Sequence, residues 1–116
     1  MTRVEQARDR RRDELNAELA RIVSVASALP GVVKILVFGS VARGDVGPAS
    51  DLDLVIVLDT DKCFIERLGE MYRMLTPRVE LDLLVYTPEE FDRLRHERSF
   101  VRRLAEEARV VHAAAA

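Results

Sequence analysis

The sequence predicts a small α/β protein of the α+β kind, with a mixed β-sheet flanked by helices. Segments with apolar residues at helical spacing alternate with short β-branched runs, and glycine or proline separates most of them. The expected order is α-β-β-α-β-α. With 116 residues, 48% hydrophobic and 33% charged, the chain has the size and composition of a single domain over residues 1–116.

The first half of the chain predicts one long helix and one buried strand. Apolar residues recur at steps of three and four toward the end of Val4–Leu29, and Pro30-Gly31 ends that helix. Arg10-Arg11-Arg12 lies among acidic residues in the polar first half, so we interpret it as a solvated face. Val32–Phe38 is nearly all apolar and predicts a strand buried on both faces. Residues 41–50 predict a loop with about one helical turn.

The second half predicts two strands and two helices. Asp51–Leu58 and Val79–Tyr86 are the expected strands, and Asp61–Leu75 has the spacing of a helix between them. The last helix should begin after the capping residue Thr87 and run to about Val111, leaving 113–116 as a disordered tail. A helical crossover predicts that the second and third strands are parallel, whereas the shorter link predicts that the first and second are antiparallel.

Composition excludes several classes of protein. The single cysteine, Cys63, has no partner within the chain, and no apolar run approaches the roughly 18 residues that span a bilayer. No charged-then-apolar leader opens the sequence, so we expect a cytoplasmic protein without a membrane partner. Residues 43–90 hold eleven acidic and five basic groups, and without a basic face no direct binding of nucleic acid is expected.

Three aspartates form the expected catalytic and metal-binding cluster. Asp51 and Asp53 lie two residues apart on a strand, so their carboxylates should project from one face. Asp82 lies among apolar residues of the next strand and can join them if the two strands pair. Carboxylates held together repel each other, and hard oxygen ligands suit Mg²⁺. Three of them can hold two metal ions about 4 Å apart for displacement at phosphorus.

Gly39-Ser40 predicts the nucleotide-binding half of the site. A glycine directly after a buried strand allows a phosphate to approach the backbone closely. The Ser40 hydroxyl can donate to a phosphate oxygen, and Arg43 is within reach of the same phosphates. The same loop can then turn away at Gly44.

These segments together resemble the DNA polymerase β-like nucleotidyltransferase superfamily. The likeness rests on Phe38-Gly39-Ser40-Val41-Ala42-Arg43-Gly44, then Ser50-Asp51-Leu52-Asp53-Leu54, then Asp82, and covers about residues 32–86. The ten-residue spacer is most similar to that of the minimal nucleotidyltransferases (MNT), the partners of HEPN proteins. Many relatives carry Arg, Tyr or Phe where this chain has Val41.

The resemblance implies a polymerase β-like fold and a Mg²⁺-dependent transfer of AMP from ATP to a hydroxyl. In the paired systems the MNT protein is the antitoxin and the acceptor is a tyrosine of a HEPN ribonuclease toxin, so a hetero-oligomer is expected. By the same likeness, Asp51 and Asp53 bind two Mg²⁺ ions and Asp82 holds the catalytic ion. Gly39 and Ser40 grip the triphosphate with Arg43. Larger relatives add a helical domain at the acceptor site, which a second chain would replace here.

Other functions remain open at this stage. A protein with this fold could neutralise a toxin by steric binding alone, or could transfer the nucleotide to a small molecule. A receiver domain has a similar length, but its acids follow its strands, whereas Asp51-Leu52-Asp53 opens one. The nucleotide preference, the acceptor residue, the number of transfers and the oligomeric state are also left open.

Overall fold

One four-stranded sheet forms the centre of the molecule. The computed structural model describes residues 1–115, without the side chains of Phe100 and Ala105. Its strands are β1 (Val32–Phe38), β2 (Leu52–Leu58), β3 (Leu81–Tyr86) and β4 (Arg109–Ala113), in the spatial order β3-β2-β1-β4. Its helices are α1 (Arg3–Ser27), α2 (Gly39–Arg43), α3 (Phe64–Leu75), α4 (Pro88–Glu97) and α5 (Ser99–Glu107).

The strand pairing confirms the predicted mixed sheet. Strand β1 pairs with β2 in antiparallel fashion, and β2 pairs with β3 in parallel. The parallel pair is joined through α3, as a helical crossover requires. The five-residue helix α2 occupies the link between the antiparallel strands, close to the single turn expected there.

The prediction of a last helix reaching Val111 is wrong. The chain is extended at Arg98, which separates α4 from α5, and a fourth strand follows instead of the helix end. Strand β4 pairs with β1, whose backbone groups on that side need hydrogen-bond partners, and the β-branched Val110 and Val111 suit a strand. Ala113 ends β4, and the next residue's N–H still donates to the Val33 carbonyl at 2.8 Å. Of the expected tail, residue 116 lies outside the described residues.

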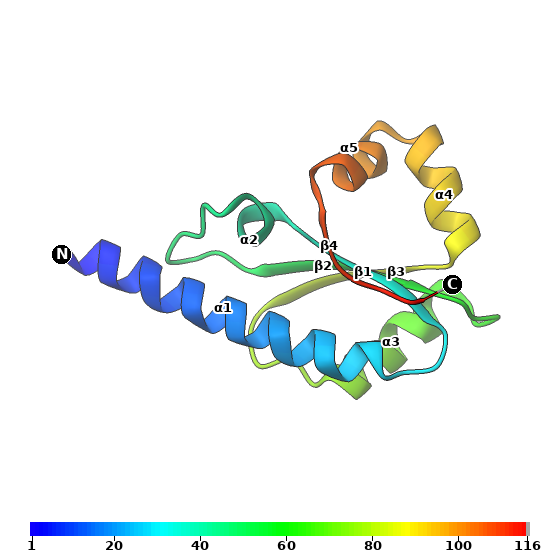
Figure 1. Ribbon diagram of the computed structural model, residues 1–116, viewed down its shortest axis with the longest axis horizontal. Coiled ribbons are helices and arrows are strands. Elements are labelled where there is room, and N and C mark those ends of the chain that lie inside the picture. The colour runs from blue at the N-terminus through cyan, green and yellow to red at the C-terminus, as the bar shows by residue number, and fades with distance from the viewer. Residues whose placement is uncertain (116) are drawn as a thin grey trace.

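Two layers of helix cover the sheet (Figure 1). Helices α1 and α3 pack on one face, and α4 and α5 pack on the other. Because side chains alternate along each strand, the core has two parts. The part under α1 and α3 contains Leu52, Leu54, Ile56, Leu81, Leu83 and Val85. The second face receives Val55 and Val57 of β2 together with Phe91, Val101 and Leu104 of the helices. By the same alternation, Asp53 and Asp82 belong to the face of α4 and α5.

Helix α1 is long enough to extend beyond the sheet. Its 25 residues span about 37 Å, and Figure 1 shows its amino-terminal half lying beside the loop between α2 and β2. Apolar residues of its second half are buried, including Leu15, Ile22 and Ala26. A capping box of Thr2 and Glu5 begins the helix. Within residues 1–115, no helix combines the length and apolar character needed to cross a membrane.

Candidate active site

Strand pairing brings three predicted site residues to one end of the sheet. Phe38, the last residue of β1, pairs with Asp53 near the start of β2. Asp53 in turn pairs with Asp82 near the start of β3. Gly39, which follows Phe38, therefore lies against Asp53, whose other neighbour in the sheet is Asp82. This is a consequence of register, since a shift of one residue would turn either aspartate to the opposite face.

The carboxyl groups of Asp53 and Asp82 form an interacting pair. The pKa of Asp53 is raised to about 6, first because the side chain is partly buried. A hydrogen bond between its carboxyl group and that of Asp82 raises the pKa further, and the negative charges of Asp82 and Asp51 add to the effect. The positive charge of Arg43 opposes it. The pair therefore favours an additional positive charge, whether a proton or a cation.

Gly39 lies directly against the Asp53 side chain. Its φ of 68° is in the left-handed region, which glycine adopts without strain. A Cβ atom built on Gly39 would overlap the Asp53 carboxylate, whereas one on Gly44, also left-handed at φ 80°, meets nothing within 4 Å. The glycine expected to admit a phosphate is thus also required for the position of Asp53.

Asp51 does not share the environment of the other two aspartates. It precedes β2, and its Oδ1 atom lies 3.9 Å from Nη2 of Arg11 on α1. It remains close enough for its charge to raise the pKa of Asp53. Within residues 1–115, no three His, Cys, Asp or Glu side chains are already arranged as a metal site. The predicted trio is therefore a close pair with a third carboxylate beside it.

The other predicted contacts lie around α2. Ser40 is in its first turn, where its carbonyl accepts hydrogen bonds from the N–H groups of Gly44 and Asp45 at 2.9 and 3.1 Å. The half-exposed Arg43 donates from Nε to Asp45 at 3.2 Å, and the Nη donors of its guanidinium group are other groups that could bind a phosphate. Val41 is buried in the core, so its side chain does not face the site. The roles of Ser40 and Arg43 in nucleotide binding stay predictions.

Two side chains that the sequence did not indicate as site residues donate hydrogen bonds to backbone carbonyls next to the aspartates. Arg11 donates from Nε to the carbonyl of Ser50 at 2.8 Å, so interpreting it as part of a solvated face was wrong. The Tyr72 hydroxyl on α3 donates to the carbonyl of Leu81 at 2.7 Å. Each carbonyl belongs to the residue directly before an aspartate. No spacing in the sequence signals these contacts, because each joins a helix to the segment beside a different strand.

The donor set fits a hard divalent cation. Asp53 and Asp82 provide carboxylate oxygens whose mutual repulsion a cation would relieve, and carboxylates are ligands that Mg²⁺ accepts together with substrate phosphates. Asp51 can add a third carboxylate if it turns from Arg11. Such a site, next to the side-chain-free Gly39, suits chemistry at a phosphate group.

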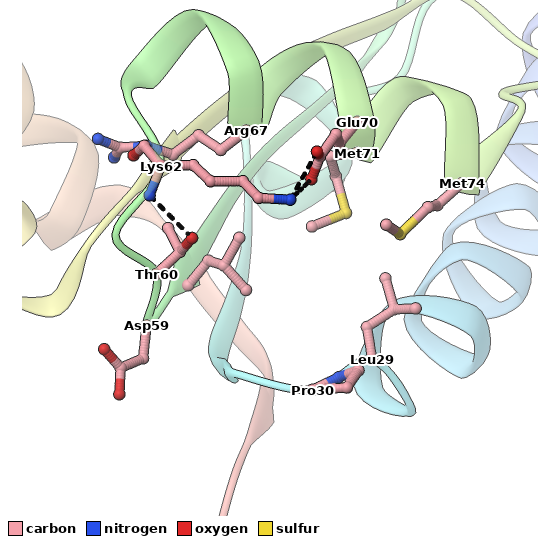
Figure 2. A pocket seen from close by; sticks show the side chains of 10 residues that line it. Leu29, Pro30, Asp59, Thr60, Lys62, Arg67, Glu70, Met71 and Met74 are labelled. Carbon is pink, nitrogen blue, oxygen red and sulfur yellow. Dashed lines mark hydrogen bonds and ion pairs between the residues drawn. The ribbon is translucent and has the colours of Figure 1, made fainter.

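A cavity of about 190 Å³ lies at the opposite end of the sheet (Figure 2). Leu58 and Asp59 at the end of β2 line it, together with Leu29 and Pro30 before β1. Figure 2 shows the Lys62 ammonium group paired with the Glu70 carboxylate there, at 2.6 and 2.7 Å. None of the predicted site residues lines this cavity, so it is separate from the aspartate pair.

Comparison with known proteins agrees with this geometry. Residues 17–111 match the family model described as "Nucleotidyltransferase domain". The fold is similar to a crystal structure at 1.40 Å resolution of a protein from Sulfolobus solfataricus assigned as a nucleotidyltransferase, with a TM-score of 0.60 and 28% sequence identity. The similarity covers 75% of this chain and 79% of that one. A search of curated proteins gave no match. Because the family model spans most of the chain, including the aspartates and Gly39, the chain belongs to the nucleotidyltransferase domain family.

Proposed function

We propose that the protein is a Mg²⁺-dependent nucleotidyltransferase that transfers AMP from ATP to a partner protein. The acceptor is a tyrosine hydroxyl of a HEPN ribonuclease toxin, and the transfer makes this chain the antitoxin. The observation that carries the proposal is the register of Asp53 and Asp82, which places two carboxylates together beside Gly39. The likeness of the Gly-Ser, ten-residue spacer and Asp-x-Asp pattern to the MNT proteins supports the choice of partner.

The roles proposed for the residues combine their positions with the likeness to the superfamily. Asp53 and Asp82, with Asp51, would hold Mg²⁺, which supplies positive charge to the phosphates of ATP when it is bound. Gly39 leaves the backbone open to the triphosphate, and the Ser40 hydroxyl donates to it. In the transfer, the acceptor oxygen forms a bond to the α-phosphorus and pyrophosphate leaves. Asp82 would help to activate the acceptor hydroxyl by accepting the proton that this hydroxyl loses.

The test is transfer of label from α-labelled ATP with Mg²⁺ to the product of the gene adjacent to this one, which the proposal expects to be a HEPN protein. Wild type should label it, and Asp53→Asn and Asp82→Asn should not. Asp59→Asn is the matched control, because this exposed carboxylate lies at the far end of the same strand. Replacing the acceptor tyrosine by phenylalanine should also abolish labelling. Absence of label with wild type, or equal labelling with Asp53→Asn, would contradict the catalytic proposal.

Steric neutralisation is the second candidate. The amino-terminal half of α1 extends beyond the sheet, and its Val4 is 67% exposed, so it offers a surface to a partner. An Asp53→Asn variant that protects cells from the toxin without labelling it would favour this candidate. Label found on a small molecule, with none on protein, would instead indicate the third function considered above.

A further inference from the structure

Arg11 connects α1 to the segment that carries Asp51. Its side chain is only 20% exposed, although it lies in the polar half of the helix. Besides the hydrogen bond to the Ser50 carbonyl at 2.8 Å, its Nη1 atom donates to Glu14 at 3.1 Å. Glu14 lies one turn further along α1, so it orients the guanidinium group toward the loop.

Other hydrogen bonds on either side of Asp51 hold the chain without reaching Ser50 from α1. Strand β2 begins at Leu52, whose N–H donates to the Glu80 carbonyl at 3.1 Å. On the other side, the turn of residues 47–50 is closed on itself: the Ser50 N–H donates to the Gly47 carbonyl, and the Gly47 N–H donates to Ser50 Oγ. Arg11 ties this turn to the body of the protein immediately before Asp51.

Arg11 is hydrogen-bonded to the backbone of Ser50 but lies farther from the carboxylate of Asp51. The Nε–carbonyl distance of 2.8 Å is that of a well-formed hydrogen bond, whereas Nη2 lies 3.9 Å from Asp51 Oδ1. The stronger contact is therefore with the neutral carbonyl of Ser50. This contact leaves the Asp51 carboxylate free to turn toward Asp53 while its backbone stays fixed.

We propose that Arg11 is a positioning residue for the nucleotidyl transfer. By holding the Ser50 carbonyl, it fixes the direction from which Asp51 presents its carboxylate to the cation bound by Asp53 and Asp82. The inference rests on the proposed function, because it assigns Asp51 a role in holding the divalent cation. It adds α1, a helix outside the Gly-Ser and aspartate motifs, to the machinery of the site.

Loss of the Arg11 side chain would change cation affinity in opposite directions through charge and through positioning. Removing a positive charge near a cation site should by itself strengthen cation binding, because a repulsion is lost. Losing the position of Asp51 should weaken it. Arg12 is the matched control: it is half-exposed and pairs with Asp9 and Asp13 of its own helix at 3.4 and 3.7 Å.

The experiment compares wild type, Arg11→Gln, Arg11→Lys and Arg12→Gln. Binding of Mn²⁺ alone is measured by electron paramagnetic resonance, and amide hydrogen exchange is measured by NMR. For Arg11→Gln we expect Mn²⁺ affinity to fall about tenfold and exchange at Ser50 and Leu52 to accelerate about tenfold. Arg11→Lys keeps a charged donor group that can reach a carbonyl and should recover part of both losses. In labelling assays the Mg²⁺ concentration for half-maximal rate should rise, with the rate largely restored at saturation.

Each outcome distinguishes the two proposals. Wild type that binds Mn²⁺ and labels the acceptor, with Arg11→Gln equal to it or tighter in Mn²⁺ affinity, would overturn the role of Arg11 alone. Equal losses in Arg12→Gln would overturn it too, because the effect would then not depend on the Ser50 contact. Accelerated exchange throughout α1 and β2 in Arg11→Gln would show a general structural role and would also overturn it. Wild type that neither binds Mn²⁺ nor labels any acceptor would overturn the proposed function, and with it this inference.

Discussion

Gly39 and Asp53 are packed so closely that a single methyl group on the glycine would overlap the aspartate's carboxylate. Position 39 therefore requires both a left-handed backbone and the absence of a side chain, because the Asp53 carboxylate occupies the space where a Cβ atom would lie. Gly44 shares only the first, since its φ is 80° and a Cβ atom there meets nothing within 4 Å. The two glycines thus allow backbone strain and a clash at the site to be measured separately.

Gly39→Ala should impair transfer much more strongly than Gly44→Ala. Both substitutions place alanine in a left-handed conformation, at a cost of about 1 kcal/mol in the free energy of unfolding. Only Gly39→Ala should also displace Asp53, so we expect an additional loss of stability and a rate at least tenfold lower. Urea unfolding and the labelling assay provide the measurements. Equal rates for the two variants would contradict the assigned contact.

Asp53→Asn should make the metal-free protein more stable while abolishing transfer. Because folding raises the pKa of Asp53 from 3.8 to about 6, its ionised form costs the folded state free energy above that pH. The neutral amide removes the repulsion with Asp82, so the midpoint of thermal unfolding at pH 8 in a chelator should rise. Asp59→Asn should change neither property. A lower midpoint for Asp53→Asn would show that the carboxylate stabilises the fold.

The ion pair between Arg67 and Glu90 should make stability depend on pH in the acidic range. Arg67 of α3 donates from Nη2 to Glu90 of α4 at 3.1 Å and from Nη1 to the Val85 carbonyl at 3.2 Å, joining the two helical layers around β3. Hydrogen bonding from Arg67 lowers the pKa of Glu90 from 4.5 to about 2. The stabilisation is therefore complete above pH 4.5 and is lost as the pH falls toward 2.

Glu90→Gln tests this dependence. At pH 7 it should lower the free energy of unfolding by about 2 kcal/mol, because the buried Arg67 charge loses its partner. The difference from wild type should shrink steadily between pH 4.5 and 2, as denaturant titrations at several pH values would reveal. Glu89→Gln, one residue away and outside the pair, should leave the pH profile unchanged. A difference that stays constant with pH would exclude the ion pair as its source.

Tyr72→Phe should loosen the start of β3 without disturbing the core. The substitution keeps the ring but removes the hydrogen bond to the Leu81 carbonyl, which should lower the free energy of unfolding by about 1 kcal/mol. Amide exchange should accelerate most at Asp82, and transfer should slow because this residue is less well held. Tyr86→Phe serves as the comparison, since it removes a hydroxyl from the other end of β3. Identical behaviour of the two variants would argue against a positioning contact.

Local patterns predicted most of the fold because each depends on neighbouring residues. Thr87 and Glu90 lie three residues apart and form the predicted capping box. Leu81, Leu83 and Val85 alternate along β3, and all three are buried in the core. The ten residues between β1 and β2 were too few for a full helical crossover, so their antiparallel pairing also followed. β4 was missed because helical spacing continued through a segment that pairs with β1 instead.

The sequence by itself indicated the nucleotidyltransferase family, predicted the order of the elements through β3, and singled out Gly39, Asp53 and Asp82 as candidate site residues. All three depend on residue type and on spacing along the chain. Strand pairing then brings residues at these positions close together. Only the tertiary structure decided that Asp51 faces Arg11 while Asp53 pairs with Asp82. It alone also showed that the long first helix reaches the site. A guanidinium group and a carbonyl 39 positions apart meet only after helix and sheet pack together, and no local periodicity encodes that contact.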